Sequence, residues 1–286
     1  PESRGEEPAF EGASPGDGDD YGYLLSGSIG DGIQIGYCAG TGGGWSTELI
    51  AHESQIHKVP EDISDEGAVI LEPAAGGVHT ALKAKVQSGD VVVVQGSGTM
   101  GLCSIAAIRQ FTEAEIIIAA AKYPIQRSLA EEFGADIVVE PNELKRAVRQ
   151  VTGCKMIGNA LSGGSNVTID AVGSASSIQT SLEITKPRGR LVMLGMPVVA
   201  KVDLTPLWHR EIEMVGSYTY GTEVLPDGTV TNSYDLAFKL VRDMELEKLV
   251  TDLYPLDRYK QAIRHAAEAG PLGAIKVVFD LRGEKR

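Results

Sequence analysis

A run of β-branched residues followed by a glycine-rich turn constrains the fold of this chain more than any other feature. The segment VVVVQGSGTMGL, residues 91–102, places three glycines in the spacing G-x-G-x-x-G. In this spacing the backbone turns tightly after a strand, approaches a phosphate group and starts a helix that packs on the sheet. The N–H groups and positive dipole end of that helix then face the phosphates. We therefore predict that a dinucleotide contacts Gly96, Ser97, Gly98, Thr99, Met100 and Gly101.

Segments typical of strands and helices alternate through the middle of the chain. The expected strands lie at 91–95, 115–120, 136–140, 166–173, 188–196, 211–220 and 274–281. The expected helices lie at 63–85, 102–111, 123–134, 143–153, 176–185, 234–243 and 256–269. Continuous apolar runs such as VVVV are typical of strands buried on both faces of a parallel sheet. The alternation therefore predicts an α/β fold with a doubly wound parallel (Rossmann) sheet.

The start of the chain carries weaker signals. Residues 1–20 are acidic and rich in glycine and proline, so we expect them to be disordered. Residues 21–55 contain short strand-like pieces separated by glycines, including a turn and a strand at 42–52. Ser64 is well placed to cap the helix that follows it.

The charge, the apolar runs and the cysteines of the chain indicate which partners and which cellular compartment to expect. The net charge of −13 argues against nucleic acid or an anionic membrane surface as a partner. The sequence has no run of 18 or more apolar residues, and its first residues lack the pattern of a secretory signal. Its three cysteines are far apart and form no C-x-x-C motif, which argues against a disulfide framework. We therefore expect a cytoplasmic protein with reduced thiols.

The residues after the second strand bear on which dinucleotide is bound. In this fold an acidic residue about 20 residues after the glycines usually holds the ribose 2′-hydroxyl. Here Ala121 stands at that position, and Lys122 and Arg127 follow it. Two cations without an acid suit a 2′-phosphate, which favours NADP(H) over NAD(H). The alternative is that both cations are solvated surface groups and that NAD(H), or either cofactor, is used.

Several motifs occur in a fixed order between Gly42 and Leu281. They are GGGWSTELIAH, VPEDISDEGAVILEPAAGGVHTAL, GSGTMGL, AEEFGAD, IDAVG, RGRLVMLGMP, MVGSYTYG and GAIKVVF. In this order they resemble the zinc-type medium-chain dehydrogenase/reductase superfamily, which includes the alcohol and polyol dehydrogenases. The resemblance implies a Rossmann domain inserted in a GroES-like β domain. The expected parts are a partial GroES-like catalytic domain at 1–73, the Rossmann domain at 74–220 and a return to the catalytic domain at 221–286.

The resemblance also implies hydride transfer between a nicotinamide cofactor and a small alcohol, a polyol or the carbonyl product, assisted by zinc in the complete protein. The nicotinamide is expected at the carboxyl ends of strands, where ligands of such sheets bind. The residues concerned are Ala171, Val172, Gly173, Leu194, Gly195 and Met196. By analogy with the family, His79, Ser217 and Tyr218 face the same cleft and Lys276 reaches the cofactor phosphates. Asp170 is expected to orient backbone at this edge.

The zinc site is only partly matched. Glu72, followed by Pro73, corresponds to the family position at the edge of the catalytic zinc, so Glu72 is the expected metal ligand; the alternative is a helix-end carboxylate. The family's cysteine ligand and Gly-His-Glu motif are not found before GGGWS, and Cys38, His52 and His57 have no metal-like spacing. We favour a fragment of a longer protein over a natural degenerate member. A zinc-free quinone or enone reductase and a cofactor-binding chain without turnover stay open as alternatives.

The segment EIEMVGSYTY, residues 211–220, is apolar and ends the expected sheet. An unpaired edge strand of this kind tends to be paired or covered. The resemblance implies that it meets its twin across a two-fold axis, which gives a homodimer or homotetramer. The alternative is a monomer in which another segment covers this edge.

Overall fold

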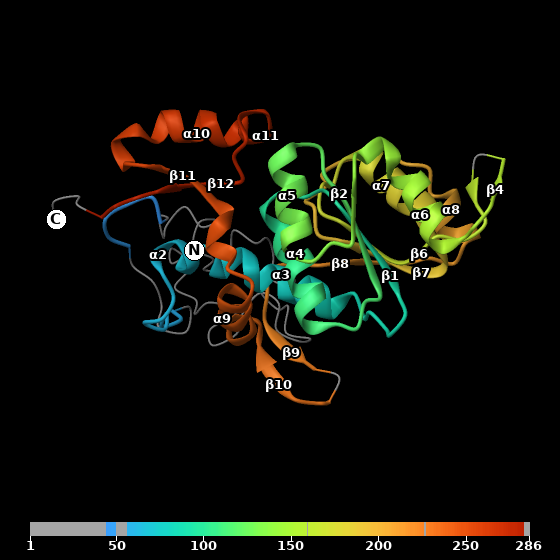
Figure 1. Ribbon diagram of the computed structural model, residues 1–286, viewed down its shortest axis with the longest axis horizontal. Coiled ribbons are helices and arrows are strands. Elements are labelled where there is room, and N and C mark those ends of the chain that lie inside the picture. The colour runs from blue at the N-terminus through green and yellow to red at the C-terminus, as the bar shows by residue number, and fades with distance from the viewer. Residues whose placement is uncertain (1–43, 50–55, 159, 226, 283–286) are drawn as a thin grey trace, which may run out of the picture.

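A parallel sheet of six strands forms the centre of the structure, a computed structural model that describes residues 44–49, 56–158, 160–225 and 227–282 (Figure 1). The strands lie in the order β3-β2-β1-β6-β7-β8, and every neighbouring pair is parallel. Their bounds are Val91–Gln95 for β1, Ile116–Ala120 for β2, Ile137–Val139 for β3, Ser165–Asp170 for β6, Thr185–Met193 for β7 and Glu213–Gly216 for β8. This order confirms the predicted doubly wound sheet, because the chain leaves β1 in one direction and β6 in the other.

Helices cover both faces of the sheet, with α4 and α5 on one side and α6 and α7 on the other (Figure 1). The helices before and within the sheet are α2 (Asp65–Ala68), α3 (Leu71–Lys83), α4 (Thr99–Phe111), α5 (Pro124–Glu132), α6 (Leu144–Thr152), α7 (Ala175–Ile184) and α8 (Thr205–His209). A 3-10 turn, η4 (Pro141–Glu143), precedes α6, and a hairpin of β4 (Met156–Ile157) and β5 (Ala160–Leu161) precedes β6.

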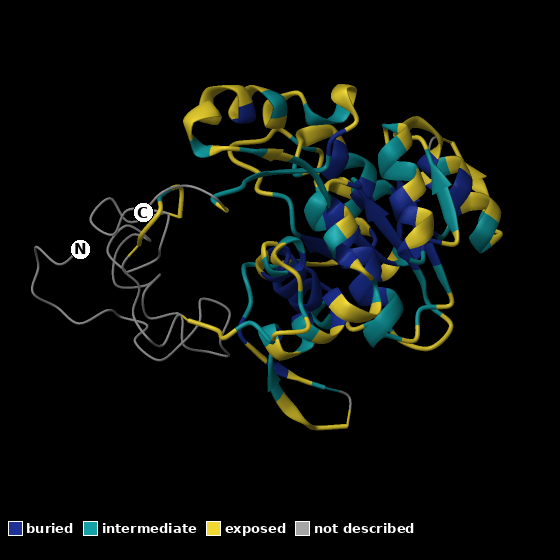
Figure 2. Ribbon diagram, turned by 60° about the vertical axis from the view of Figure 1, so that its left-hand side comes forward, coloured by how far each residue is buried: buried dark blue, intermediate teal, exposed yellow. Residues whose placement is uncertain are grey.

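Alternation along the central strands produces the two cores. Val92 and Val94 face the core that also contains Ile105 of α4. Val93, between them, faces the opposite core, together with Val148 of α6. Successive side chains of a strand point to opposite faces, so an uninterrupted valine run is what a sheet covered on both sides requires. Figure 2 shows the buried residues gathered in the sheet and in the helices that lie on it.

The tail of the chain forms smaller units around α3 and beyond α5. Its elements are β9 (Thr222–Val224), β10 (Val230–Asn232), α9 (Ser233–Asp243), η5 (Leu246–Leu249), β11 (Val250–Tyr254), η6 (Leu256–Arg258), α10 (Tyr259–Ala267), α11 (Ala269–Leu272) and β12 (Lys276–Phe279). Helix α9 packs against α3, and α10 packs on the parallel pair of β11 and β12. No helix in the described part of the chain is long and apolar enough to cross a membrane.

The single helix expected at 63–85 is two helices, α2 and α3, for a local reason. The single helix expected at 256–269 is likewise divided into η6, α10 and the start of α11. Ser64 caps α2 as predicted, since its Oγ accepts from Gly67 N at 3.1 Å. The second helix begins at Leu71, which places Pro73 in its first turn. Proline is tolerated there but not in a helix interior, because it has no N–H and its ring clashes with the preceding turn.

The last strand of the sheet is shorter than predicted. The expectation covered 211–220, whereas β8 includes only Glu213–Gly216. Glu211 and Thr219 have φ values of +52° and +51°, and this left-handed backbone is incompatible with an extended strand. The last four residues of the predicted strand therefore form irregular backbone with a bend at Thr219, after the carboxyl end of β8.

The predictions for the start of the chain fall mostly outside the described residues. These include the expected disorder of 1–20, the strand-like pieces at 21–43, Cys38 and His52. Residues 44–49, which belong to the turn and strand expected at 42–52, form bends and irregular backbone.

Candidate functional site

The predicted cofactor residues follow the carboxyl ends of neighbouring strands, so the topology brings them to one edge. The glycine loop follows β1, and residues 171–173 follow β6, the strand beside it. The two segments are bonded directly, because Ala171 N donates to the carbonyl oxygen of Gln95 at 2.9 Å. The connections from β1 and β6 run in opposite directions, and the crevice at such a switch point is where doubly wound sheets bind their ligands.

The glycine loop has the shape that a pyrophosphate requires. Gly96 has a φ of +96°, and a Cβ atom on Gly101 would lie only 1.9 Å from the carbonyl oxygen of Gly96. At Gly98, in contrast, an added Cβ would meet nothing within 4 Å. Gly98 is also the N-cap of α4, and it provides no side chain to cap that helix. The start of α4 therefore presents uncapped N–H groups beside an open space, which fits a bound phosphate.

Side chains in the loop stabilise its position. Ser97 is buried, and its Oγ donates to the carbonyl oxygen of Ala120 at 3.1 Å. Thr99 Oγ1 donates to the carbonyl oxygen of Ile275 at 3.2 Å, which joins α4 to the segment before β12. Met100 lies against α3, since its Cε would be 2.8 Å from a Cβ at Gly76. Any contact of Ser97 or Thr99 with phosphate would therefore come from the backbone N–H.

The loops expected around the nicotinamide are held together by Asp170. Its Oδ1 accepts from Val172 N at 2.9 Å and from Gly173 N at 3.0 Å. Its carbonyl oxygen accepts from Leu194 N at 3.0 Å and from Gly195 N at 2.8 Å. Asp170 thus orients backbone as predicted, and it fixes the ends of β6 and β7 next to each other.

In these two loops the glycines are closely packed, whereas Val172 and Met196 are exposed. A Cβ on Gly195 would lie 2.4 Å from Gly173 N, so neither loop has room for a larger residue at this contact. Val172 and Met196 are exposed, the latter to 84%. Within the described residues, these two side chains present an open apolar surface beside the glycine loop.

Ser217 and Tyr218 follow β8 at the same edge. Ser217 N donates to the carbonyl oxygen of Met193, and Ser217 Oγ lies 2.9 Å from Thr80 Oγ1 of α3. Tyr218 is partly buried. The structure therefore places both residues where α3 meets the carboxyl end of the sheet.

Ala121, Lys122 and Arg127 follow the carboxyl end of β2. Ala121 is fully buried and its N–H donates to the carbonyl oxygen of Val139 at 2.9 Å. Lys122 is exposed, with its Nζ 5.4 Å from the centroid of the Tyr123 ring. Arg127 Nη1 donates to the carbonyl oxygen of Lys122 at 3.1 Å, so its guanidinium lies beside the turn that carries Ala121.

The sequence analysis missed Glu140, the residue that follows β3. Its Oε1 lies 3.4 Å from Nη1 of Arg127. The rule that searches for an acid after β2 does not extend to β3, although β3 is the neighbouring strand. Applied to both strand ends, that rule would have identified Glu140.

Glu72 lies in the first turn of α3, where a carboxylate interacts favourably with the helix dipole. Loss of hydration beside the surrounding protein raises the pKa of Glu72, although part of the residue is exposed to solvent. The positive charge of Lys276 lowers the pKa of Glu72, but by less. Lys276 also lowers the pKa of the Cys103 thiol, while burial dominates and raises it to about 12. Lys276 therefore lies within electrostatic range of both groups.

The described residues do not provide a zinc site. Within them, no group of three or more His, Cys, Asp or Glu side chains is placed to hold a metal ion. A catalytic zinc requires three protein ligands and an open position. His57 stacks on Tyr234, with ring centroids 4.0 Å apart. Glu72 alone is at the expected position, and the described part of the chain does not fit zinc.

A buried polar network connects α3 with the tail. His79 Nδ1 lies 2.8 Å from Glu223 Oε1, which also accepts a hydrogen bond from Ser233 Oγ at 2.5 Å. All three residues are buried. The sequence analysis did not find this network, because His79 and Glu223 are 144 positions apart and no motif contains both.

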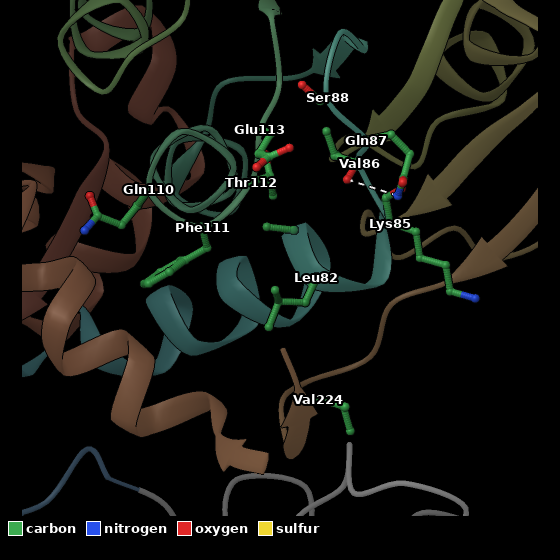
Figure 3. A pocket seen from close by; sticks show the side chains of 11 residues that line it. Leu82, Lys85, Val86, Gln87, Ser88, Gln110, Phe111, Thr112, Glu113 and Val224 are labelled. Carbon is green, nitrogen blue, oxygen red and sulfur yellow. Dashed lines mark hydrogen bonds between the residues drawn. The ribbon is translucent and has the colours of Figure 1, made fainter. Parts of the chain in front are cut away.

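Described residues outside the glycine loop line hollows, two of which differ in their position relative to the candidate site. One, of about 650 Å³, lies between the carboxyl ends of α3 and α4 and includes Leu82, Phe111 and Val224 (Figure 3). It contains none of the predicted cofactor residues. The other, of about 440 Å³, has a mainly apolar lining that includes Lys276 and Phe279 of β12. Only the second therefore borders the candidate site.

Residues 99–233 match the family described as zinc-binding dehydrogenase. This match covers slightly less than half of the chain, and it supports the resemblance to the zinc-type medium-chain dehydrogenase/reductase superfamily. The chain is similar to sorbitol dehydrogenase of Macaca fascicularis, with 26% identity over 216 residues that cover 72% of this chain and 54% of the relative. It is also similar to D-arabitol-phosphate dehydrogenase of Enterococcus avium, with 25% identity over 252 residues that cover 85% of this chain and 65% of the relative.

Solved structures of this superfamily share the fold. L-idonate 5-dehydrogenase of Escherichia coli superposes with a TM-score of 0.64 at 25% identity, over 81% of this chain and 61% of that chain. The 2R,3R-butanediol dehydrogenase of Bacillus subtilis gives a TM-score of 0.66 at 23% identity, over 84% of this chain and 64% of that chain. The chain thus spans between about half and two thirds of the length of these proteins.

Substitutions at Gly98 and Gly101 should separate effects on cofactor affinity from effects on thermal stability. In Gly98→Ala the added methyl group has free space, so we expect unchanged thermal stability but at least about tenfold weaker NADPH binding, because the methyl group would occupy the path of the phosphates. In Gly101→Ala the methyl group collides with backbone, so we expect a lower melting temperature as well. Calorimetry and NADPH fluorescence titration measure the two effects. Wild-type affinity in Gly98→Ala would show that no phosphate approaches this residue.

Proposed function

We propose that this chain is the dinucleotide-binding part of an oxidoreductase that transfers hydride between a nicotinamide cofactor and a small alcohol, a polyol or the corresponding carbonyl compound. The observation that carries the proposal is the uncapped start of α4 beside the open face of Gly98. The similarity to dehydrogenases of sorbitol and arabitol phosphate supports the substrate class. When bound, the nicotinamide supplies the hydride acceptor or donor.

The residues of this chain would position the cofactor. We assign the pyrophosphate to backbone N–H groups from Gly96 to Gly101. We assign the nicotinamide to the loops that Asp170 joins, where the exposed apolar side chains of Val172 and Met196 would shield one face of the ring. Holding the ring in one orientation reduces the entropy lost when the substrate and cofactor reach the reactive geometry.

We propose Glu72 as one ligand of a zinc ion in the complete protein. This assignment rests on the Glu72–Pro73 motif and on the family of the chain. The described residues hold no second or third ligand, so none of the chemistry of this chain is assigned to a metal. A cytoplasmic location stays a prediction from the three cysteines.

We further propose a preference for NADP(H) over NAD(H). Buried Ala121 provides no carboxylate for the ribose hydroxyl, while exposed Lys122 and half-buried Arg127 provide positive charge next to it. A 2′-phosphate carries close to two negative charges and several acceptor oxygens, so cations at this position favour it.

Changing Ala121 tests this preference. Ala121→Asp should weaken NADPH binding about tenfold or more relative to NADH, because the new carboxylate repels the 2′-phosphate and accepts from a ribose hydroxyl. Ala121→Ser is the matched control, since it adds a polar atom without charge. Both cofactors are titrated by fluorescence. Tighter binding of NADH than of NADPH by tenfold in the unchanged chain would contradict the proposed preference.

The 286-residue chain should bind reduced nicotinamide dinucleotide but retain no stoichiometric zinc and oxidise no alcohol. Metal analysis and NADP⁺ reduction over a panel of alcohols and polyols measure this, with a sorbitol dehydrogenase as the positive control. If neither NADPH nor NADH binds, the proposed function fails. Stoichiometric zinc with turnover would show that Cys38, His52 or His57 completes a metal site.

The edge strand β8 is the proposed contact in a homodimer or homotetramer. It has one neighbour, β7, within the described sheet, and an open strand edge offers N–H and C=O groups for pairing. Two copies related by a two-fold axis would bring two such edges together and satisfy both.

Light scattering at tens of micromolar protein should therefore show a dimer or larger assembly. Met214→Lys places a charge on the edge strand and should shift the assembly towards the monomer. Met156→Lys is the matched control, because Met156 is exposed to 41%, close to the 38% of Met214, but lies on the β4 hairpin. An unchanged chain that stays monomeric, or an equal effect of both variants, would exclude β8 as the interface.

A further inference from the structure

Three segments that are separate in sequence meet at the carboxyl ends of β2 and β3. Ala121, after β2, is bonded through its N–H to the carbonyl oxygen of Val139 in β3. Glu140 directly follows Val139, so its backbone lies beside the turn of Ala121 and Lys122. Helix α5 begins three residues after Ala121 and brings Arg127 back over this turn.

The guanidinium of Arg127 is held from one side. Its Nη1 donates to the carbonyl oxygen of Lys122 at 3.1 Å and to that of Ala121 at 3.5 Å, and it lies 3.4 Å from Glu140 Oε1. Within the described residues, Nε and Nη2 of Arg127 make no hydrogen bond. The side chain is 32% exposed, and these two nitrogens are not engaged by the described residues, so we take them as the donors for a ligand.

We propose that Glu140 sets the cofactor preference of this site by opposing the 2′-phosphate of NADP(H) at Arg127. The inference rests on the proposed function, because it takes the adenosine ribose to lie at the end of β2. The carbonyl oxygen of Lys122, at 3.1 Å, holds the guanidinium more closely than Glu140 does at 3.4 Å, so Arg127 depends little on Glu140 for its place. What Glu140 adds is a negative charge that partly neutralises Arg127 and faces the incoming dianion.

The distance between Arg127 and Glu140 indicates that Glu140 opposes the 2′-phosphate rather than holding Arg127 in position. A strong charge-assisted hydrogen bond between guanidinium and carboxylate has an N–O distance of about 2.7–2.9 Å, and the observed separation is longer. The carboxylate side chain is 55% exposed, and exposed ion pairs of this kind contribute little to the order of their partners. Glu140, at the end of β3, would thus disfavour the 2′-phosphate in the way that an acidic residue at the end of β2 does in other proteins of this fold.

The variant Glu140→Gln tests this inference, because glutamine keeps an acceptor for Arg127 and removes only the charge. We expect NADPH to bind about two- to fivefold more tightly, the size of an exposed charge pair, with NADH affinity unchanged. The gain should shrink as salt is raised, since the effect is electrostatic. Glu143→Gln is the matched control: Glu143 is exposed in η4, three residues away, and its change should leave both affinities unaltered.

The outcomes separate this inference from the proposed function. Unchanged or weaker NADPH binding in Glu140→Gln overturns the inference, because weaker binding would mean that Glu140 positions Arg127. An equal gain in Glu143→Gln also overturns it, since any nearby acid would then act alike. The proposed NADP(H) preference is judged instead from the unchanged chain and from Arg127→Gln, which should bind NADPH several-fold more weakly and NADH as before.

Discussion

The contact between the start of α4 and the glycine loop is the constraint on which the rest of the site depends. Even a methyl group on Gly101 would overlap the carbonyl oxygen of Gly96, so the helix can lie this close to the end of β1 only with glycine at that position. The same contact places Ala171, at the end of β6, against the loop. Glycine at this position thus lets the first N–H groups of the helix lie close to two strand ends. Backbone donors in this arrangement are what the proposed phosphate site requires.

The polar side chains near this contact support the loops more than they face a ligand. Ser97 and Thr99 bond to carbonyl oxygens of other segments, and Asp170 holds four N–H groups from the ends of β6 and β7 through its carboxylate and carbonyl oxygens. Buried polar groups that are satisfied in this way make a loop rigid, since breaking one bond leaves an unpaired group in the interior. The site is therefore rigid although it consists largely of loops.

Periodicity and the glycine spacing were enough to predict the sheet and the helices that cover it, because these depend on local pattern. The break between α2 and α3 was missed, although Pro73 contained the signal for it. The end of β8 depends on the positive φ of Thr219, and this backbone angle cannot be predicted from a threonine in the sequence. The pairs His79–Glu223 and Arg127–Glu140 were beyond reach for a different reason: they form only when the chain has folded, and neither belongs to a motif.

The choice between NADP(H) and NAD(H) depends on the few charged groups near the end of β2 rather than on the net charge of the chain. The chain carries a net charge of −13, which disfavours any polyanion at long range. At physiological ionic strength, however, exposed charges are screened beyond about 8 Å. A 2′-phosphate at the end of β2 would therefore respond mainly to the few groups around it. Among the described residues named here, these are Lys122 and Arg127, with one acid, Glu140, bonded to the same guanidinium. The local balance is positive but small, and removing a single charge from it is enough to cancel it or to double it.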